Sequence, residues 1–265
     1  MVEIIDRPGM KAQVKTLLRD AQVNPKAFVA LYLAINLLLG LADSLANPGE
    51  TITATNPLGM FVYILTSLVG SVLGAGFILY CMAVRRGERA EFLTLFDGFS
   101  FAGKVVGLAI VETFFIMLWS MLLVIPGIVA AYRYRFALTN LCQNPELGIM
   151  DALNMSKAQT VGYKGQLFML DLSYFGWMLL ASLPTGVLTW LETSAVMRGQ
   201  EIAFPLHPAV WLAVCSLWQL AVSVFYLADY QCVELGYYET AQRTSGVSAD
   251  SQVPPPRDED HFDIF

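Results

Sequence analysis

Residues 59–84 read GMFVYILTSLVGSVLGAGFILYCMAV, and this run decides the fold class. It contains no charged side chain, and a helix needs only about 20 apolar residues to cross the roughly 30 Å hydrocarbon core of a bilayer. As a helix the run is roughly 39 Å long, so it can tilt within the membrane or project beyond it. The run therefore predicts a transmembrane helix rather than a buried helix of a water-soluble domain.

Further apolar segments lie on both sides of this run, and together they predict six spans. The shortest of them, the fourth, gives only roughly 24 Å of helix and contains two arginines. The predicted spans are residues 27–45, 59–84, 105–125, 128–143, 167–190 and 209–227.

The composition agrees with a membrane protein. Hydrophobic residues make up 56% of the 265-residue chain and charged residues 14%, against about 45–50% and about 25% in ordinary soluble domains. So few charges cannot coat a water-soluble core of this size. The net charge is −6, and no basic patch interleaved with aromatic residues suggests nucleic-acid binding.

Three amphipathic stretches separate the spans and predict short helices on the cytoplasmic side. They cover residues 10–21, 88–99 and 144–158, and each places an apolar stripe beside basic residues. Such helices lie in the headgroup plane of a bilayer, or they pack on the ends of the helix bundle; both interpretations stay open. In the third stretch we expect Asn144 as the N-cap and Pro145 at the first helical position.

The chain is expected to have three parts. Residues 1–26 are a cytoplasmic amphipathic helix, 27–243 the transmembrane domain and 244–265 a disordered acidic tail. Five basic residues precede the first span and none lies in residues 46–58; because positively charged loops resist translocation, both termini should be cytoplasmic. Residues 44–46 resemble a signal-peptide cleavage site, but the segment before the first apolar run is too long for a signal peptide, so we expect no cleavage.

Ionisable side chains inside spans are costly and mark candidate sites. By helical depth, Arg135 could reach Glu112, and Arg133 could extend outward toward Glu192. Buried ion pairs that fix helix register are the favoured interpretation, and a polar pathway for an ion, proton or small solute is the alternative. The candidate cluster consists of Glu112, Arg133, Arg135 and Asp171 within the predicted spans and Asp229 just after the sixth.

Two local motifs predict how the helices turn and pack. Ile125-Pro126-Gly127 predicts a tight outer turn, with the tip of a re-entrant hairpin as the alternative. Gly70 and Gly74 lie four residues apart among other small residues, which allows another helix to approach closely. We expect internal packing there, with a homodimer interface as the alternative.

No motif predicts an enzyme. His207 and His261 are the only histidines, and the sequence contains no HExxH, GxSxG or phosphate-loop pattern. We therefore expect no catalytic residue, no metal site and no cofactor. The cysteines lie far apart without a CxxC pair, which predicts free buried thiols at Cys81, Cys142, Cys215 and Cys232.

Three motifs together resemble a known family. In order and spacing they are similar to an uncharacterised bacterial family of multi-spanning membrane proteins, catalogued as a domain of unknown function. The resemblance covers most of the chain and implies a membrane location and a helical architecture, but no activity. The motifs are Ile125-Pro126-Gly127-Ile128 with Ala131-Tyr132-Arg133-Tyr134; Asn144-Pro145-Glu146-Leu147 with Ala152-Leu153 and Ser156-Lys157; and Leu170-Asp171-Leu172-Ser173 with Gly176-Trp177.

We therefore expect an all-α, polytopic transmembrane helix bundle of the cell membrane. The leading hypothesis is a non-enzymatic scaffold or accessory protein of the envelope, whose partners are the lipid bilayer and either another membrane protein or a second copy. The alternative is a small-solute or lipid-handling transporter that uses the intramembrane polar cluster.

Overall fold

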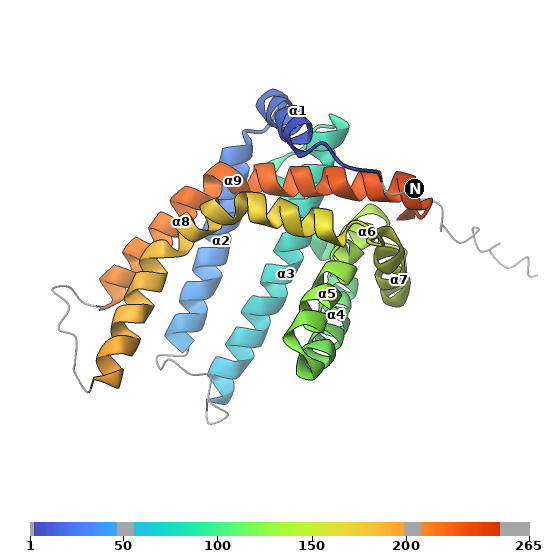
Figure 1. The fold of residues 1–265 in the computed structure, drawn as a ribbon. Coiled ribbons are helices and arrows are strands. Elements are labelled where there is room, and N and C mark those ends of the chain that lie inside the picture. Colours follow the sequence, from blue (N-terminus) through green and yellow to red (C-terminus); the bar gives the residue numbers. More distant parts are fainter. Residues whose placement is uncertain (1–2, 47–55, 199–207, 250–265) are drawn as a thin grey trace, which may run out of the picture. The chain divides into compact units, whose positions relative to one another are not determined.

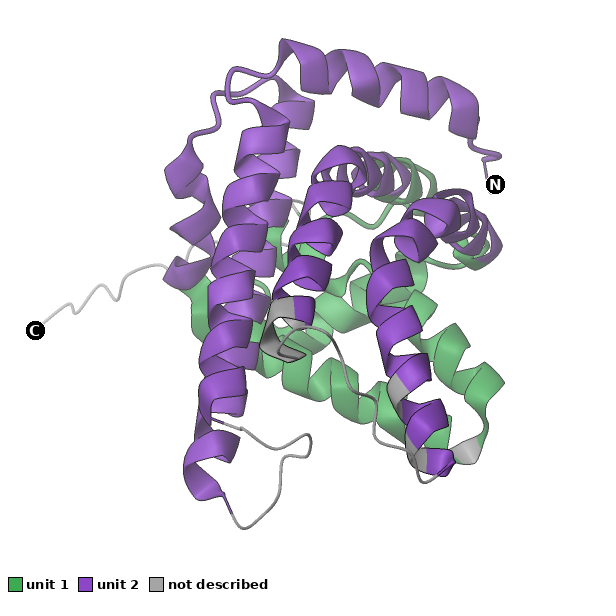
Figure 2. Ribbon diagram, turned by 90° about the vertical axis from the view of Figure 1, so that its left-hand side faces the viewer, with its two compact units in different colours: residues 1–2, 101–164, 238–265 green, residues 3–100, 165–237 purple. Residues whose placement is uncertain are grey.

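The structure is a computed structural model that describes residues 3–46, 56–198 and 208–249 (Figure 1). Every element in these ranges is a helix, which confirms the all-α class. The chain divides into two compact units (Figure 2). Of the described residues, unit 1 holds 101–164 and 238–249, and unit 2 holds 3–100 and 165–237.

Both units are purely helical over the described residues, and α9 contributes to each of them. Unit 2 contains mainly α1 (Arg7–Asp20), α2 (Pro25–Ala46), α3 (Pro57–Arg86), the 3₁₀ helix η1 (Phe92–Phe101), α8 (Lys164–Met197) and most of α9 (Pro208–Ser245). Unit 1 contains α4 (Ala102–Leu122), α5 (Val124–Tyr134), α6 (Ala137–Gln143), α7 (Ile149–Gln159) and the last residues of α9.

Five helical stretches are long and apolar enough to cross a membrane. They correspond to the first, second, third, fifth and sixth predicted spans. In α2, for example, only Phe28 and Val29 are buried, and Leu38, Leu41 and Leu45 are exposed, as contact with lipid requires. These helices indicate a multi-pass membrane protein. The five stretches are Pro25–Ala46, Pro57–Arg86, Phe92–Met121, Lys164–Ala195 and Ala213–Ser245.

The predicted fourth span, residues 128–143, is not one helix: α5 ends at Tyr134 and α6 begins at Ala137. At the break, a serine of α7 forms hydrogen bonds with the backbone in place of the next turn of the helix. Ser156 Oγ donates to the Arg133 carbonyl at 2.9 Å and accepts from the Phe136 N–H at 3.1 Å. The 11 residues of α5 are only roughly 16 Å long, too short to cross a bilayer alone. The count of six spans is therefore not confirmed.

The chain turns tightly between α4 and α5, as predicted, but two residues earlier than the expected motif. The turn is at Leu123, whose backbone is extended (φ −162°, ψ 150°), and Pro126 and Gly127 lie in the first turn of α5. Proline is tolerated in that position. A Cβ on Gly127 would lie 3.0 Å from the Cα of Ser120, so this glycine allows α5 to pack closely on α4.

Helices occupy all three predicted amphipathic stretches, with corrections to two of them. α1 covers the first and buries Val14, whereas η1 forms the second as a 3₁₀ helix. The third, α7, begins at Ile149, so the prediction of Asn144 as its N-cap is wrong. Asn144 Oδ1 instead accepts from the Glu146 N–H at 3.0 Å and closes a turn. The position of these helices in a headgroup plane stays a prediction.

An aromatic cluster and a close approach at Gly76 hold α2, α3 and η1 together in unit 2. Phe28 stacks on Tyr80 with 3.7 Å between ring centroids, and Tyr80 OH donates to the Val23 carbonyl at 3.1 Å. A Cβ on Gly76 of α3 would lie 2.6 Å from the carbonyl carbon of Leu95 in η1. The four cysteines are free and buried, as predicted.

The predicted glycine pair does not provide this close approach. A Cβ on Gly74 would meet nothing within 4 Å, and one on Gly70 would meet only the Asn36 side chain, at 3.5 Å. The glycine that another element crosses is Gly76, two residues beyond Gly74. Whether Gly70 and Gly74 face a second copy stays a prediction.

Buried amides form the core of unit 1. Asn140 and Gln159 exchange two side-chain hydrogen bonds of 2.9 Å, and Tyr238 OH donates to Asn140 Oδ1 at 2.9 Å. Gln159 Nε2 also donates to the Val247 carbonyl at 3.1 Å. The chain is thus held in unit 1 beyond residue 244, where the predicted tail begins; residues 250–265 of that tail lie outside the described residues.

Candidate functional site

The five ionisable residues of the predicted cluster fall in different units. Glu112, Arg133 and Arg135 belong to unit 1, on α4 and at the end of α5, whereas Asp171 and Asp229 belong to unit 2, on α8 and α9. Within unit 2 the structure connects the two helices that carry the aspartates through two tyrosines. Within unit 1 it does not form the expected pair.

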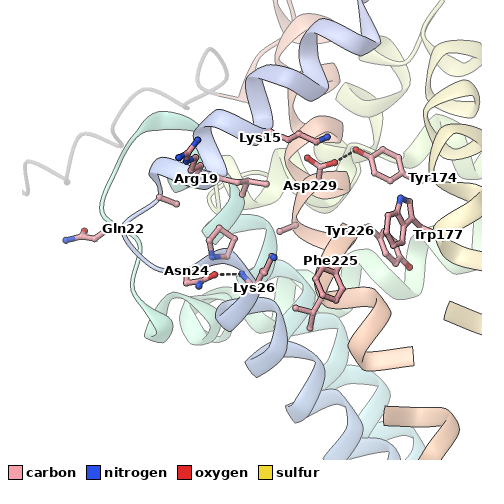
Figure 3. A pocket seen from close by; sticks show the side chains of 15 residues that line it. Lys15, Arg19, Gln22, Asn24, Lys26, Tyr174, Trp177, Phe225, Tyr226 and Asp229 are labelled. Carbon is pink, nitrogen blue, oxygen red and sulfur yellow. Dashed lines mark hydrogen bonds between the residues drawn. The ribbon is translucent and has the colours of Figure 1, made fainter. Parts of the chain in front are cut away.

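Two tyrosine–aspartate hydrogen bonds cross between α8 and α9. Tyr174 OH donates to Asp229 Oδ2 at 2.7 Å, and Tyr230 OH donates to Asp171 Oδ1 at 2.7 Å (the first is drawn in Figure 3). The two tyrosine rings meet edge to face with 5.2 Å between centroids. Each helix thus supplies one donor and one acceptor. On α8 these are Tyr174 and Asp171, which are three positions apart and therefore share a face of the helix. We call these four residues the Asp–Tyr cross.

The Asp–Tyr cross fixes the register of α8 against α9. Hydrogen bonds to a carboxylate are roughly twice as strong as neutral ones, and they strengthen further in surroundings of low dielectric constant. Sliding either helix by one residue would break both bonds and remove a tyrosine donor from each of two partly buried carboxylates, which is costly.

A lysine from α1 lies beside the Asp–Tyr cross. Lys11 Nζ donates to Ser173 Oγ at 3.0 Å and lies 3.9 Å from the centroid of the Tyr174 ring. Burial lowers the pKa of Lys11, and the negative charge of Asp229 partly offsets this effect. The second carboxylate oxygen, Asp229 Oδ1, is buried and accepts no hydrogen bond from the residues that the structure describes. Lys11 therefore contributes a compensating charge without bonding to this aspartate.

The predicted ion pair between Glu112 and Arg135 is not formed. Glu112 is half-buried and has neither a hydrogen bond nor an ion pair with any residue in the described ranges. The Arg135 guanidinium instead lies 5.5 Å from the ring centroid of Tyr132. Helical rise gives the depth of a residue, but it does not give the direction of its side chain. The proposed partner of Arg133, Glu192, has a side chain outside what the structure describes.

A cavity of about 720 Å³ opens between α1, the start of α2 and the facing parts of α8 and α9 (Figure 3). Lys15 and Arg19 come from α1 and Lys26 from the first turn of α2. Aromatic side chains from α8 and α9 form the other side, together with Asp229 of the Asp–Tyr cross. Its volume is within the range of small-molecule sites, roughly 300–1,000 Å³.

A second, smaller cavity of about 240 Å³ lies farther along α2 and α9. Four polar side chains line it, Asn36 from α2 and Ser216, Gln219 and Ser223 from α9. Asn36 lies 11 residues beyond the start of α2, which is roughly 17 Å of helix. Polar side chains therefore face each other well inside a candidate span.

Comparison with known proteins gives a family for the chain. Residues 109–243, just over half of its length, match the family described as protein of unknown function DUF975. The chain belongs to the DUF975 family. Neither a curated protein nor a solved structure matches it. The DUF975 match is shorter than the expected resemblance, but it contains the whole Asp–Tyr cross and all five predicted site residues; α1 and Lys26 lie before it.

Sequence reasoning missed both tyrosines and both cavities of this DUF975 protein. A signal for the tyrosines was present, because Asp171 and Tyr174 are three residues apart and Asp229 and Tyr230 are adjacent. Paired acids and phenols on two apolar helices predict mutual hydrogen bonding once the helices are known to be neighbours. The larger cavity depends on how α1 packs beside α8 and α9, and the smaller one on how α2 faces α9; hydropathy reveals neither.

The Asp–Tyr cross predicts a stability effect. Tyr174→Phe and Tyr230→Phe should each lower the free energy of unfolding in detergent by roughly 1–3 kcal/mol, because each removes a tyrosine hydrogen bond to a partly buried carboxylate. Chemical unfolding followed by circular dichroism measures this. Tyr63→Phe on α3 is the matched control, because Tyr63 is exposed. Equal losses at all three tyrosines would contradict a role of the cross in register.

Proposed function

We propose that this DUF975 protein is a non-enzymatic protein of the bacterial cell membrane that acts as a scaffold or accessory to other envelope components. The observation that carries the proposal is the Asp–Tyr cross: the aspartates of α8 and α9 each accept a hydrogen bond from the facing helix. Acids that accept hydrogen bonds from a facing helix support a role in a packed framework, which we propose over an ion pathway.

A co-purification experiment tests this role. The full chain, solubilised in mild detergent after brief crosslinking in its native membrane, should bring down a defined membrane-protein partner in stoichiometric amount. The double variant Tyr174→Phe/Tyr230→Phe should lose that partner in parallel with its loss of stability. Recovery of the chain alone with several crosslinkers of different length would contradict the scaffold.

The orientation of the chain is part of the proposal. Reporter fusions after Asn56 should report outside and those after Gly87 inside, because the flanking basic residues are expected in the cytoplasm. A fusion after Gly162 tests whether α5 and α6 jointly return the chain to the cytoplasmic side. An inside signal there supports six crossings with both termini in the cytoplasm, and an outside signal contradicts them.

A second candidate function, small-solute or lipid handling, is favoured by the polar cavity at Asn36, Gln219 and Ser223. Under this alternative, Asn36→Leu should reduce flux in reconstituted vesicles while the protein remains folded. Leu38→Ala, at an exposed apolar position of the same helix, is the control and should leave flux unchanged.

Glu112 distinguishes the two functions. Since Glu112 has no partner among the described residues, Glu112→Gln removes an ionisable side chain without a compensating partner from an apolar helix. For a scaffold we expect an unchanged or higher melting temperature in detergent and normal recovery of the partner. A transporter that uses Glu112 would instead lose flux with its melting temperature preserved.

A further inference from the structure

The cavity beneath α1 has one strongly cationic wall. Lys15 and Arg19 lie one turn apart on α1, and Lys26 adds a third positive charge from the start of α2. Figure 3 shows these side chains around the opening. Asp229 is the single acidic residue that lines the cavity, so the lining carries a net positive charge. Such a wall favours an anion.

The three cations are available to a ligand. All three side chains are exposed, and neither Lys15 nor Arg19 has a hydrogen bond or ion pair with any residue in the described part of the chain. Lys26 Nζ lies 4.9 Å from the centroid of the Phe225 ring. Like charges one turn apart repel each other, and an anion bound between Lys15 and Arg19 would remove that cost.

The opposite wall is aromatic. Trp177 from α8 and Tyr226 from α9 stack with 6.2 Å between centroids and 21° between planes, and Phe225 lies beside Lys26. Trp and Tyr rings suit the boundary between headgroups and acyl chains, because one end of each is polar and the rest is apolar. The cavity therefore combines a cationic side for a phosphate with an apolar side for the body of the same molecule.

We infer that this cavity, between Lys15, Arg19 and Lys26 on one side and Trp177 and Tyr226 on the other, binds the phosphate of an anionic phospholipid headgroup. Arginine and lysine bind phosphate through charge-assisted hydrogen bonds. The cavity lies where α1 meets the first turn of α2, at the end of a candidate span, which is the level of lipid headgroups. The negative charge of Asp229 repels a second anion from the part of the cavity that this residue lines. The inference is independent of whether the protein is a scaffold or a transporter.

Native mass spectrometry of the full chain in detergent, titrated with dioleoylphosphatidylglycerol, tests the inference. One lipid should remain bound to the unaltered protein, and Lys15→Gln/Arg19→Gln should weaken that binding roughly 30-fold, since each basic residue near a lipid surface contributes a factor of about five. Lys15→Arg/Lys26→Arg keeps the charges and should keep the binding. Circular dichroism and size-exclusion profiles check that the variants fold.

A matched double variant and two other probes separate this site from general attraction. Arg86→Gln/Arg89→Gln removes two exposed charges outside the cavity and should leave binding unchanged. Equal weakening by both double variants would overturn the inference, as would equal binding of dioleoylglycerol, which lacks the phosphate. Competition by inorganic phosphate at the concentration of the lipid would overturn the lipid assignment in favour of a free anion, and failure to compete supports it.

Discussion

Gly76→Ala is expected to cause the largest loss of stability among the small substitutions in this chain. The added Cβ would press on the backbone of η1, lying 2.6 Å from the Leu95 carbonyl carbon and 3.0 Å from its Cα. Backbone cannot rotate away as a side chain can, so α3 and η1 must separate. Overpacking typically costs 1–3 kcal/mol, and we expect about 3 kcal/mol here. Unfolding in detergent measures the effect.

The same helix provides the control. A Cβ on Gly74 would meet nothing within 4 Å, so Gly74→Ala should leave stability unchanged or raise it by up to about 1 kcal/mol, because alanine is the better helix former. Gly98→Ala tests the contact between α3 and η1 from the η1 side, because the added Cβ would lie 2.5 Å from the Val72 carbonyl oxygen of α3. Equal effects at Gly74 and Gly76 would show that η1 does not cross α3 as described.

Asn140→Leu should be comparably damaging in unit 1. It removes both hydrogen bonds to Gln159 and one acceptor of Tyr238. Asn140 and Gln159 are fully buried, so water cannot replace the lost partner, and a buried amide left unsatisfied costs about 1–3 kcal/mol. We expect a loss of about 3 kcal/mol. Asn154→Leu on the exposed face of α7 should change stability by no more than about 0.5 kcal/mol.

A double-mutant cycle makes this prediction specific. Gln159→Leu alone should also destabilise, because it removes both hydrogen bonds to Asn140 and the one to the Val247 carbonyl. The double variant Asn140→Leu/Gln159→Leu removes both partners together and should cost less than the sum of the two single variants by roughly 1–2 kcal/mol. Strict additivity would mean that the two amides do not act as a pair.

The sequence predicts the long apolar helices well because lipid imposes a strong requirement on their composition. A run such as residues 59–84 must be helical in a bilayer to satisfy its backbone, and α3 follows that run with two more residues at each end. Hydropathy is less informative for α9, where Asp229 and Tyr230 interrupt the apolar pattern. The predicted span ends at residue 227, whereas the helix continues to Ser245.

Contacts between helices were harder to predict, because they depend on which faces meet. The break between α5 and α6 depends on Ser156, which lies 20 residues beyond Phe136 in the sequence. Glu112 and Arg135 have suitable depths, yet depth alone does not pair them. In contrast, the sequence marks Asp171 in the fifth predicted span and Asp229 just after the sixth as candidate residues. It does not pair them with tyrosines, because those hydrogen bonds depend on α8 and α9 being neighbours.

The central claim is that the exposed apolar faces of these helices contact lipid. On α4, for example, the exposed fractions are 62% for Phe114, 61% for Met117 and 77% for Met121. Extraction of membranes from cells that express the full chain, with alkaline carbonate and without detergent, tests this directly. We predict that the protein stays entirely in the membrane pellet and enters solution only with detergent. Its release into the carbonate supernatant as a folded monomer would contradict the claim.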